Sequence, residues 1–304
     1  MASVTVRAPA KVNLELSVGG LGADGYHELA TVFHAVSVAD EVTVNDDTGG
    51  VTVEVQGEQA DGVPLDADNL AVRAALLLAE HAGVEPRARI VITKGIPVAG
   101  GMAGGSADAA ATLLACDALW QTGLDRPALH ALASELGADV PFGLLGGTAV
   151  GMGRGQRLTP ALARGRFHWV FAVADVGLST RDVYAECDRL RAGRVLPEPR
   201  VSDALMAALR AGEPVALGKA LSNDLQAAAC SLRPQLRSTL DAGLEYGALG
   251  AIVSGSGPTC AFLVRDHEHG LDLAVALTAT GVCRTVKRAH GPVPGARVLV
   301  AEGL

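Results

Sequence analysis

The sequence predicts an α+β fold in two domains, and three observations support this. The chain has 304 residues, 49% of them apolar, which is enough for more than one core of ordinary size. Strand-like and helix-like segments come in groups and do not alternate regularly, which disfavours a single parallel sheet. Residues 159–166 carry Pro and Arg without periodicity. We therefore expect a domain boundary there, between domains of residues 1–158 and 159–304.

The N-terminal domain begins with strands. In residues 12–18, Val and Leu alternate with Asn, Glu and Ser, and a period of two predicts a strand with one buried face. Lys11 and Asn13 then share the other face of that strand. Further strands are predicted at residues 31–38, 41–44, 51–56, 89–93 and 146–158.

Helices separate these strands and continue beyond the boundary. A helix capped by Asp68 should run to residue 81, with Gly83 after its end. Two more are predicted at residues 105–120 and 127–137. The C-terminal domain should hold a helix at residues 181–191, several later helices, and strands at residues 168–174, 251–254, 259–264 and, as the last, 282–288.

Composition excludes several classes of function. The net charge is -8 and no Lys/Arg-rich run is visible, so we expect no nucleic-acid partner. The five cysteines are scattered without a C-x-x-C pair, which signals neither a zinc site nor a disulfide framework. No secretory segment and no apolar stretch of spanning length is visible. We therefore expect a cytoplasmic protein that does not bind membranes.

A glycine-rich segment is the most informative part of the chain. Residues 97–110 read P-V-A-G-G-M-A-G-G-S-A-D-A-A, after a predicted strand and at the start of a helix. Paired glycines let a backbone wrap closely around a ligand, and the helix N-terminus attracts anions. The spacing fits neither the Walker loop, because Ser106 stands where Lys is needed, nor the dinucleotide fingerprint. We interpret the segment as a phosphate-binding loop, against the alternative of a tight turn.

Four other features are ambiguous when each is taken alone. Lys11 could be a solvated strand-edge lysine, and the Tyr26-His27 pair could be a surface feature. Asp139 precedes a Pro and could be an N-cap. The S-G-S-G-P-T segment at residues 254–259 could be a simple hairpin turn.

Taken in order, these features resemble the GHMP kinase superfamily, which includes galactokinase, homoserine kinase and mevalonate kinase, and the likeness covers the whole chain. Galactokinase and mevalonate kinase carry G-E-H soon after the first strand, whereas this chain reads L-E-L-S-V-G-G there. The segments A-P-A-K-V-N-L, D-G-Y-H-E-L and G-A-D-V-P-F resemble the members that phosphorylate the C2 hydroxyl of a diphosphocytidyl methylerythritol in non-mevalonate isoprenoid biosynthesis.

The glycine-rich segment departs from the usual family sequence. Ala99, Met102, Ala103 and Ala107 stand where the family has Gly, Leu, Gly and Ser. Alanine costs little where φ is negative, so we expect a variant loop that keeps its function.

The resemblance implies a ribosomal-protein-S5-domain-2-like N-terminal domain, a ferredoxin-like C-terminal α/β sandwich and an ATP-dependent kinase. Lys11 and Asp139 would be catalytic, with Asp139 as the base. ATP should come with Mg²⁺, whose ligands are not legible, and Asp108 is interpreted as a first-turn helix acid. The implied ATP-site residues are Asn69, Pro97, Val98, Ala99, Gly100, Gly101, Met102, Ala103, Gly104, Gly105, Ser106 and Ala107.

For the small-molecule substrate, a cytidine diphosphate derivative, the resemblance implies Asn13, Tyr26, His27 and Tyr184. Tyr184 would stack on the cytosine, with a core tyrosine as an equal alternative. The expected assembly is a monomer or a weak homodimer. Two other functions stay open: another GHMP kinase acting on homoserine, a sugar or a mevalonate derivative, and a metabolite-binding relative without activity. The presence of both Lys11 and Asp139 argues against the second.

Overall fold

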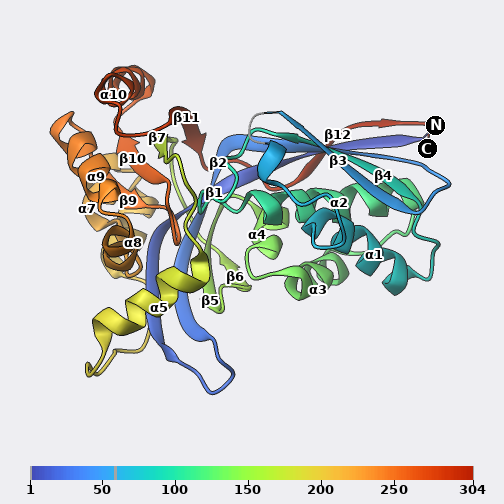
Figure 1. Ribbon diagram of the computed structural model, residues 1–304, viewed down its shortest axis with the longest axis horizontal. Coiled ribbons are helices and arrows are strands. Elements are labelled where there is room, and N and C mark those ends of the chain that lie inside the picture. The colour runs from blue at the N-terminus through green and yellow to red at the C-terminus, as the bar shows by residue number, and fades with distance from the viewer. Residues whose placement is uncertain (1, 58–59, 304) are drawn as a thin grey trace.

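Two β-sheets with helices packed against them organise the chain in the computed structural model, which describes residues 2–57 and 60–303 (Figure 1). The larger sheet has the order β12-β1-β2-β4-β3, and β5, β6 and β8 extend it through β2 and β1. Its strands are β1 (Ser3–Leu21), β2 (His27–Asn45), β3 (Val51–Gly57), β4 (Ala88–Lys94), β5 (Thr148–Gly153), β6 (Arg157–Pro160), β8 (Ser222–Asn223) and β12 (Arg297–Glu302). The expectation of an α+β fold is confirmed.

The smaller sheet is antiparallel, in the order β11-β7-β10-β9. Its strands are β7 (Phe167–Val173), β9 (Gly250–Val253), β10 (Cys260–Val264) and β11 (Thr285–Gly291). The two sheets share one apolar core, in which Trp169 and Phe171 of β7 belong to the same buried cluster as Val12 and Leu14 of β1. The side chains of this shared core hold the two sheets against each other.

The larger sheet is built around the long antiparallel pair β1–β2. Val12 and Leu14 are fully buried, as their alternation predicts, but Lys11 and Asn13 on the opposite face are also buried. Residues 31–38 and 41–44 were predicted as two strands and form the single strand β2. The change in register between Pro9 and Ala10 of β1 lets the long pair bend without breaking.

Helices cover one face of the larger sheet (Figure 1). They are α1 (Leu70–Ala82), α2 (Gly104–Trp120), α3 (Arg126–Leu136) and α4 (Val140–Leu145). Helix α2 is apolar nearly all round, with Ala109, Ala111 and Leu113 fully buried, and such a helix belongs in a core. The cap predicted for α1 is wrong by one residue. Asn69, not Asp68, is the N-cap, and its side chain accepts a hydrogen bond from the Ala71 N–H.

The remaining helices surround the smaller sheet. Helices α7, α8, α9 and α10 contact its strands, while α5 and α6 pack on α8 and α7. Their bounds are α5 (Thr180–Arg191), α6 (Asp203–Ala211), α7 (Pro214–Ala220), α8 (Gln226–Leu232), α9 (Gln235–Glu245) and α10 (His267–Thr280), and a 3₁₀ turn, η1, covers Ala60–Gly62. Within the described ranges, no helix is both long and apolar enough to span a membrane.

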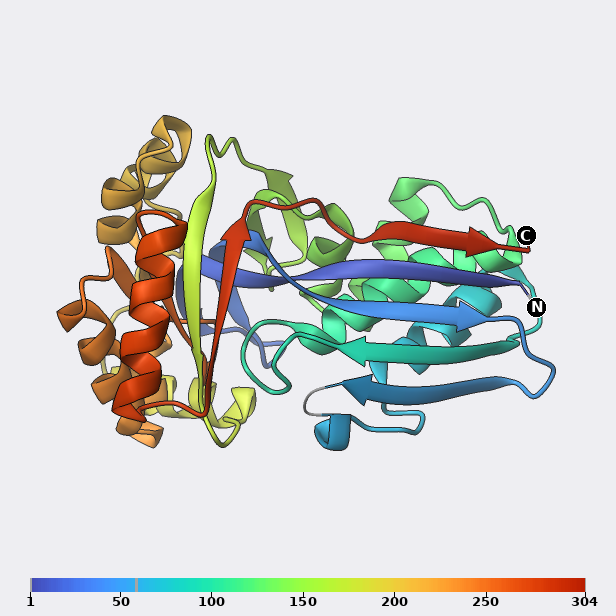
Figure 2. The same cartoon turned by 90° about the horizontal axis from the view of Figure 1, so that it is seen from above.

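The chain ends by returning to the larger sheet. Strand β12 pairs antiparallel with β1, so the last strand lies beside the first (Figure 2). Sequence reasoning missed β12 and took residues 282–288 as the final strand. The side chains of β12 are all exposed, so burial imposes no alternation there. The expected boundary after residue 158 falls inside β6, and β8 also crosses back to pair with β1; the domain division stays a prediction.

Candidate active site

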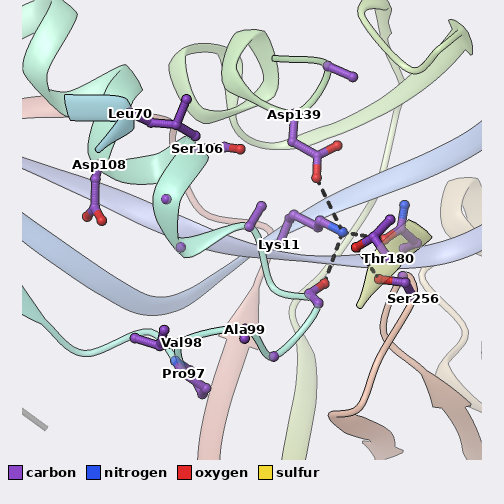
Figure 3. Close-up of a pocket in the computed structure, with 18 of the residues that line it drawn as sticks. Lys11, Leu70, Pro97, Val98, Ala99, Ser106, Asp108, Asp139, Thr180 and Ser256 are labelled. Carbon is purple, nitrogen blue, oxygen red and sulfur yellow. Dashed lines mark hydrogen bonds and ion pairs between the residues drawn. The ribbon is translucent and has the colours of Figure 1, made fainter. Parts of the chain in front are cut away.

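A cavity of about 530 Å³ opens where the glycine-rich segment, β1, α4 and α5 meet. Figure 3 shows Lys11 projecting between Asp139 and the glycine-rich segment, with Thr180 and Ser256 beside it. Lys11, Asp139, the glycine-rich segment and the 254–259 turn therefore come together in one place. Residues 97–106, which we call the glycine loop, form one wall.

The glycine loop connects the end of β4 to the start of α2. At Gly101 the backbone has a φ of 73°, and an added Cβ would collide with the backbone oxygen of Ser254. Both facts require glycine at this position. The Ser254 hydroxyl donates to the Gly101 carbonyl at 3.1 Å, so the 254–259 turn supports the glycine loop from behind.

Two alanines of the glycine loop correct the sequence interpretation. Ala99 and Ala103 have φ values of 51° and 61°, so the assumption that alanine occurs here only at negative φ is wrong. A left-handed conformation costs an L-residue roughly 1–2 kcal/mol. Gly104 and Gly105, by contrast, are the first helical residues of α2, and a Cβ at Gly105 would only touch Leu70 at 3.6 Å.

The N-terminus of α2 faces the cavity. Its N-cap is Ala103, whose methyl group cannot accept a hydrogen bond from the first-turn N–H groups. These groups and the positive end of the helix dipole form an anion site. Gly104, Gly105 and Ser106 all line the cavity, so the start of α2 is open to a ligand in it.

Lys11 is buried and held by two hydrogen bonds. Its Nζ donates to Asn13 Oδ1 at 2.6 Å and to the Gly101 carbonyl at 3.0 Å. Asn13 is itself fixed by a hydrogen bond to the Thr31 hydroxyl at 2.8 Å. The ammonium group therefore has a defined position beside the glycine loop.

Asp139 faces Lys11 across the cavity. Its Oδ2 lies 3.7 Å from Lys11 Nζ, and 34% of the side chain is exposed. It occupies the N-cap position of α4 but makes no side-chain capping hydrogen bond, so capping does not explain the residue. Gly143 has no Cβ, and this lets α4 pack close to α2: an added Cβ would lie only 2.8 Å from Ala110. The close packing brings Asp139 over Lys11.

Of the predicted substrate residues, Asn13 and Tyr184 line the cavity, whereas Tyr26 and His27 do not. Tyr184 of α5 lines it and also packs against the core of the smaller sheet, so both interpretations of this residue have a structural basis. Burial and the Asp139 charge raise the pKa of Tyr184. His27 Nε2 pairs with Asp188 Oδ1 at 2.8 Å, and its ring lies 5.0 Å from that of Tyr184. Tyr26 is 55% exposed.

The predicted ATP residues divide into three groups. Met102 and Ala107 are buried in the core, so their side chains shape the glycine loop from beneath. Asn69 caps α1 and donates its Nδ2–H to the Pro64 carbonyl at 2.7 Å, which fixes the cavity wall formed by Pro64 and Leu70. The others line the cavity directly: Pro97, Val98, Ala99, Gly100, Gly101, Ala103, Gly104, Gly105 and Ser106.

A buried ionic network beneath the glycine loop was missed in the sequence. Lys94 Nζ bridges Asp40 Oδ2 at 2.5 Å and Asp108 Oδ2 at 2.7 Å. Asp40 Oδ1 also accepts the N–H groups of Gly95 and Ile96, at 2.7 and 2.8 Å. The network therefore ties β2 and the end of β4 to α2. The scarcity of lysine, four in the chain, was the only signal that could have drawn attention to Lys94.

Asp108 corrects a second expectation. It lies beyond the first turn of α2 and is buried at the network's edge, where its Oδ1 has no hydrogen-bond partner among the described residues. Burial raises the pKa of Asp108 to about 8, against the opposing charge of Lys94 and with the help of the Asp40 charge. Its environment is set by an ion pair in the core and not by the helix dipole.

Comparison with known families matches both halves of the chain. Residues 69–147 match the GHMP kinases N terminal domain, and residues 205–283 match the GHMP kinases C terminal domain. The chain belongs to the GHMP kinase family, a class of small-molecule kinases, and it has the two-domain α+β fold of that family.

Relatives carry a more particular name. A protein of Thermobifida fusca (strain YX), 58% identical over 304 residues with 98% of each chain covered, is named 4-diphosphocytidyl-2-C-methyl-D-erythritol kinase. A crystal structure of 4-(cytidine 5'-diphospho)-2C-methyl-D-erythritol kinase aligns with a TM-score of 0.78 at 35% identity, covering 94% of this chain and 98% of that one. Homoserine kinase from Cytophaga hutchinsonii aligns with a TM-score of 0.74 at 21% identity, covering 98% of this chain and 97% of that one, which shows the shared fold alone.

Proposed function

We propose that the protein transfers the γ-phosphoryl group of ATP to the C2 hydroxyl of 4-diphosphocytidyl-2-C-methyl-D-erythritol and releases ADP, in cytoplasmic non-mevalonate isoprenoid biosynthesis. The substrate assignment is supported by full-length relatives of that name at 58% identity. The observation that carries the reaction is the pairing of Lys11 with Asp139, 3.7 Å apart, in a cavity walled by the glycine loop.

Positioning and charge neutralisation supply most of the catalysis in phosphoryl transfer. The N–H groups at the start of α2 bind the ATP phosphates. Lys11, held by Asn13 and the Gly101 carbonyl, places a positive charge beside the transferred group and the attacking oxygen. Such preorganised charge stabilises the transition state without moving during the reaction.

Asp139 takes the proton. The substrate hydroxyl oxygen forms a bond to the γ-phosphorus while the bond from that phosphorus to the β–γ bridging oxygen breaks, and ADP leaves. The hydroxyl proton passes to the Asp139 carboxylate late in the transfer, because an alcohol is too weak an acid to ionise beforehand. The 34% exposure of Asp139 and its 3.7 Å separation from Lys11 leave carboxylate oxygen accessible to the hydroxyl.

Mg²⁺ is expected to accompany ATP, and the donors present fit it. The Ser106 hydroxyl and the unpartnered Asp108 Oδ1 are oxygen donors in the cavity lining, and oxygen is the ligand Mg²⁺ prefers. Among the described residues, no three His, Cys, Asp or Glu side chains gather into a metal site. Mg²⁺ is commonly bound through one or two carboxylates together with substrate phosphates and water. When bound, Mg²⁺ would neutralise charge on the phosphates.

The proposal is tested by ADP release in a coupled assay. The purified protein receives MgATP with 4-diphosphocytidyl-2-C-methyl-D-erythritol, and parallel reactions receive homoserine, mevalonate or galactose. We expect turnover with the diphosphocytidyl substrate and only background ATP hydrolysis with the other three. Preferential turnover of any of the other three would replace the substrate assignment, and an absence of turnover with all four would favour a binding protein.

A further inference from the structure

An arginine at the rim of the cavity has no part in the mechanism derived so far. Arg154 lies in the turn between β5 and β6 and lines the cavity together with Lys11, Asp139 and Tyr184. It is a cation of the cavity lining in addition to Lys11 and Lys94. Such a cation is suited to binding an anionic group of a ligand in the cavity.

The guanidinium group of Arg154 is held in a fixed plane. Its Nη2 donates to Asp24 Oδ2 at 2.8 Å, and its Cζ lies 3.6 Å from the centroid of the Tyr26 ring. The Arg154 backbone N–H donates to Gln156 Oε1 at 2.8 Å. Asp24 and Tyr26 belong to the turn between β1 and β2, so Arg154 joins two turns that are far apart in the sequence.

The contacts that hold Arg154 leave some of its N–H donors for a ligand. A guanidinium carries five N–H donors, and the hydrogen bond to Asp24 uses one nitrogen of the fork. The arginine side chain is 46% exposed, so part of it is accessible from solvent. A planar fork matches two phosphate oxygens at once.

The proposed substrate needs such a cation. Its reacting hydroxyl must reach Asp139 and Lys11, and its diphosphate lies further along the molecule toward the cytidine. The two lysines of the cavity lining are already committed. Lys11 serves the reacting end, and Lys94 is buried between Asp40 and Asp108 with 2% of its side chain exposed. Arg154 also lines the cavity, and its side chain is partly exposed.

We propose that Arg154 binds the diphosphate of the cytidine substrate, with Asp24 and Tyr26 as the support that fixes its guanidinium plane. This inference rests on the proposed function and adds a specificity-determining residue to it. A substrate without the diphosphate, such as homoserine or mevalonate, would gain nothing from Arg154. The residue would thus favour the diphosphocytidyl substrate over the smaller ones.

The test compares ligands that differ in the diphosphate. Calorimetry measures binding of CDP and of cytidine to the wild type and to Arg154→Gln, with a non-hydrolysable ATP analogue saturating the glycine loop. We expect Arg154→Gln to weaken CDP binding about ten- to a hundredfold, as for the loss of a charge-assisted hydrogen bond, and to leave cytidine binding unchanged. Raising the salt concentration should weaken CDP binding more in the wild type than in the variant.

Arg157→Gln is the matched control. Arg157 is an exposed arginine of the neighbouring strand β6, and this change should leave both affinities at the wild-type value. Melting curves check that the variants are folded.

Each other outcome has a definite meaning. Wild-type CDP affinity in Arg154→Gln would overturn the role of Arg154 while leaving the proposed function intact. An equal loss for cytidine and CDP would also overturn it, because Arg154 would then act through the position of Tyr26. A wild-type protein that binds neither ligand would overturn the substrate assignment and this inference together.

Discussion

Two clusters of lysine and aspartate lie against the glycine loop. They differ in how deeply they are buried and in how closely their charges are paired. In the first, Lys94 and both of its partners, Asp40 and Asp108, are at most 3% exposed in their side chains. In the second, Lys11 is buried but Asp139 is 34% exposed, and the two are 3.7 Å apart. The same residue types therefore serve different purposes.

The difference follows from where the charges can find partners. A buried ion pair stabilises a fold only when its geometry and hydrogen bonds compensate for the loss of water. Asp40 meets this condition with three donors, and the network holds the stem of the glycine loop to α2. Asp139 is left partly exposed, so a substrate hydroxyl can reach it. In the proposed mechanism, the first cluster builds the site and the second carries out the reaction.

The largest expected effect is on the reaction. Asp139→Asn keeps the shape of the side chain and its ability to cap α4 but removes the base. Single-turnover phosphoryl transfer should slow by about 10²–10⁴-fold, with ligand affinity and melting temperature nearly unchanged. A near-wild-type rate would exclude Asp139 as the base and remove the distinction between the clusters.

The equivalent substitution in the buried network, Asp108→Asn, should change how the free energy of unfolding depends on pH. The pKa of Asp108 is raised to about 8 in the folded protein from an ordinary value of 3.8. The folded state therefore holds a proton that the unfolded chain releases, and wild-type stability falls as pH rises from about 4 to 8, by at most about 1.4 kcal/mol per pH unit from this group. Asp108→Asn has no such proton.

Denaturant unfolding from pH 4 to pH 8 checks this prediction. The free energy of unfolding of Asp108→Asn, relative to the wild type, should rise steadily across the range. Parallel curves for the two proteins would mean that Asp108 is ionised in the fold at every pH tested, and that the network compensates both carboxylates fully.

The smallest effect concerns the glycine loop between the two clusters. Ala103 has a φ of 61°, a conformation that glycine adopts without steric cost. Ala103→Gly should raise the free energy of unfolding by about 0.5–1 kcal/mol, the relief of strain being partly offset by the greater freedom of the unfolded chain. Thermal and urea unfolding measure it.

Ala107→Gly is its control, since Ala107 lies within α2, where glycine costs about 1 kcal/mol relative to alanine. Equal losses in the two variants would show that the left-handed alanine carries no strain.

The sequence predicted the second cluster better than the first, for a physical reason. Lys11, Asp139 and the glycine loop stand in recognisable local segments, so residue type and order were enough to propose a site. The network of Lys94 joins residues 54 and 14 positions away, and nothing in their local sequence records that pairing. The network is defined by the burial of its charges, and these residues become buried only when β2, β4 and α2 pack together.

The same limit applies to the rest of the fold. The alternation of apolar and polar residues, and glycines at the ends of elements, predicted the main strands of both sheets and the main helices. They did not predict β12, whose exposed side chains need no pattern. They also gave no sign of the left-handed backbone at Ala99 and Ala103, because alanine ordinarily indicates negative φ. Contacts such as those that close the glycine loop on the 254–259 turn are tertiary and have no local signature.

One matched pair of variants tests the central claim most directly: Lys11→Met and Lys94→Met, compared by single-turnover phosphoryl transfer and by the free energy of unfolding. Lys11→Met should stay folded and slow the transfer by at least about 10²-fold, because charge at the transferring phosphoryl is lost. Lys94→Met should lose about 3–5 kcal/mol of unfolding free energy, because the buried Asp40 carboxylate loses its cation. A stable Lys94→Met protein, or a Lys11→Met protein with wild-type transfer, would contradict the account.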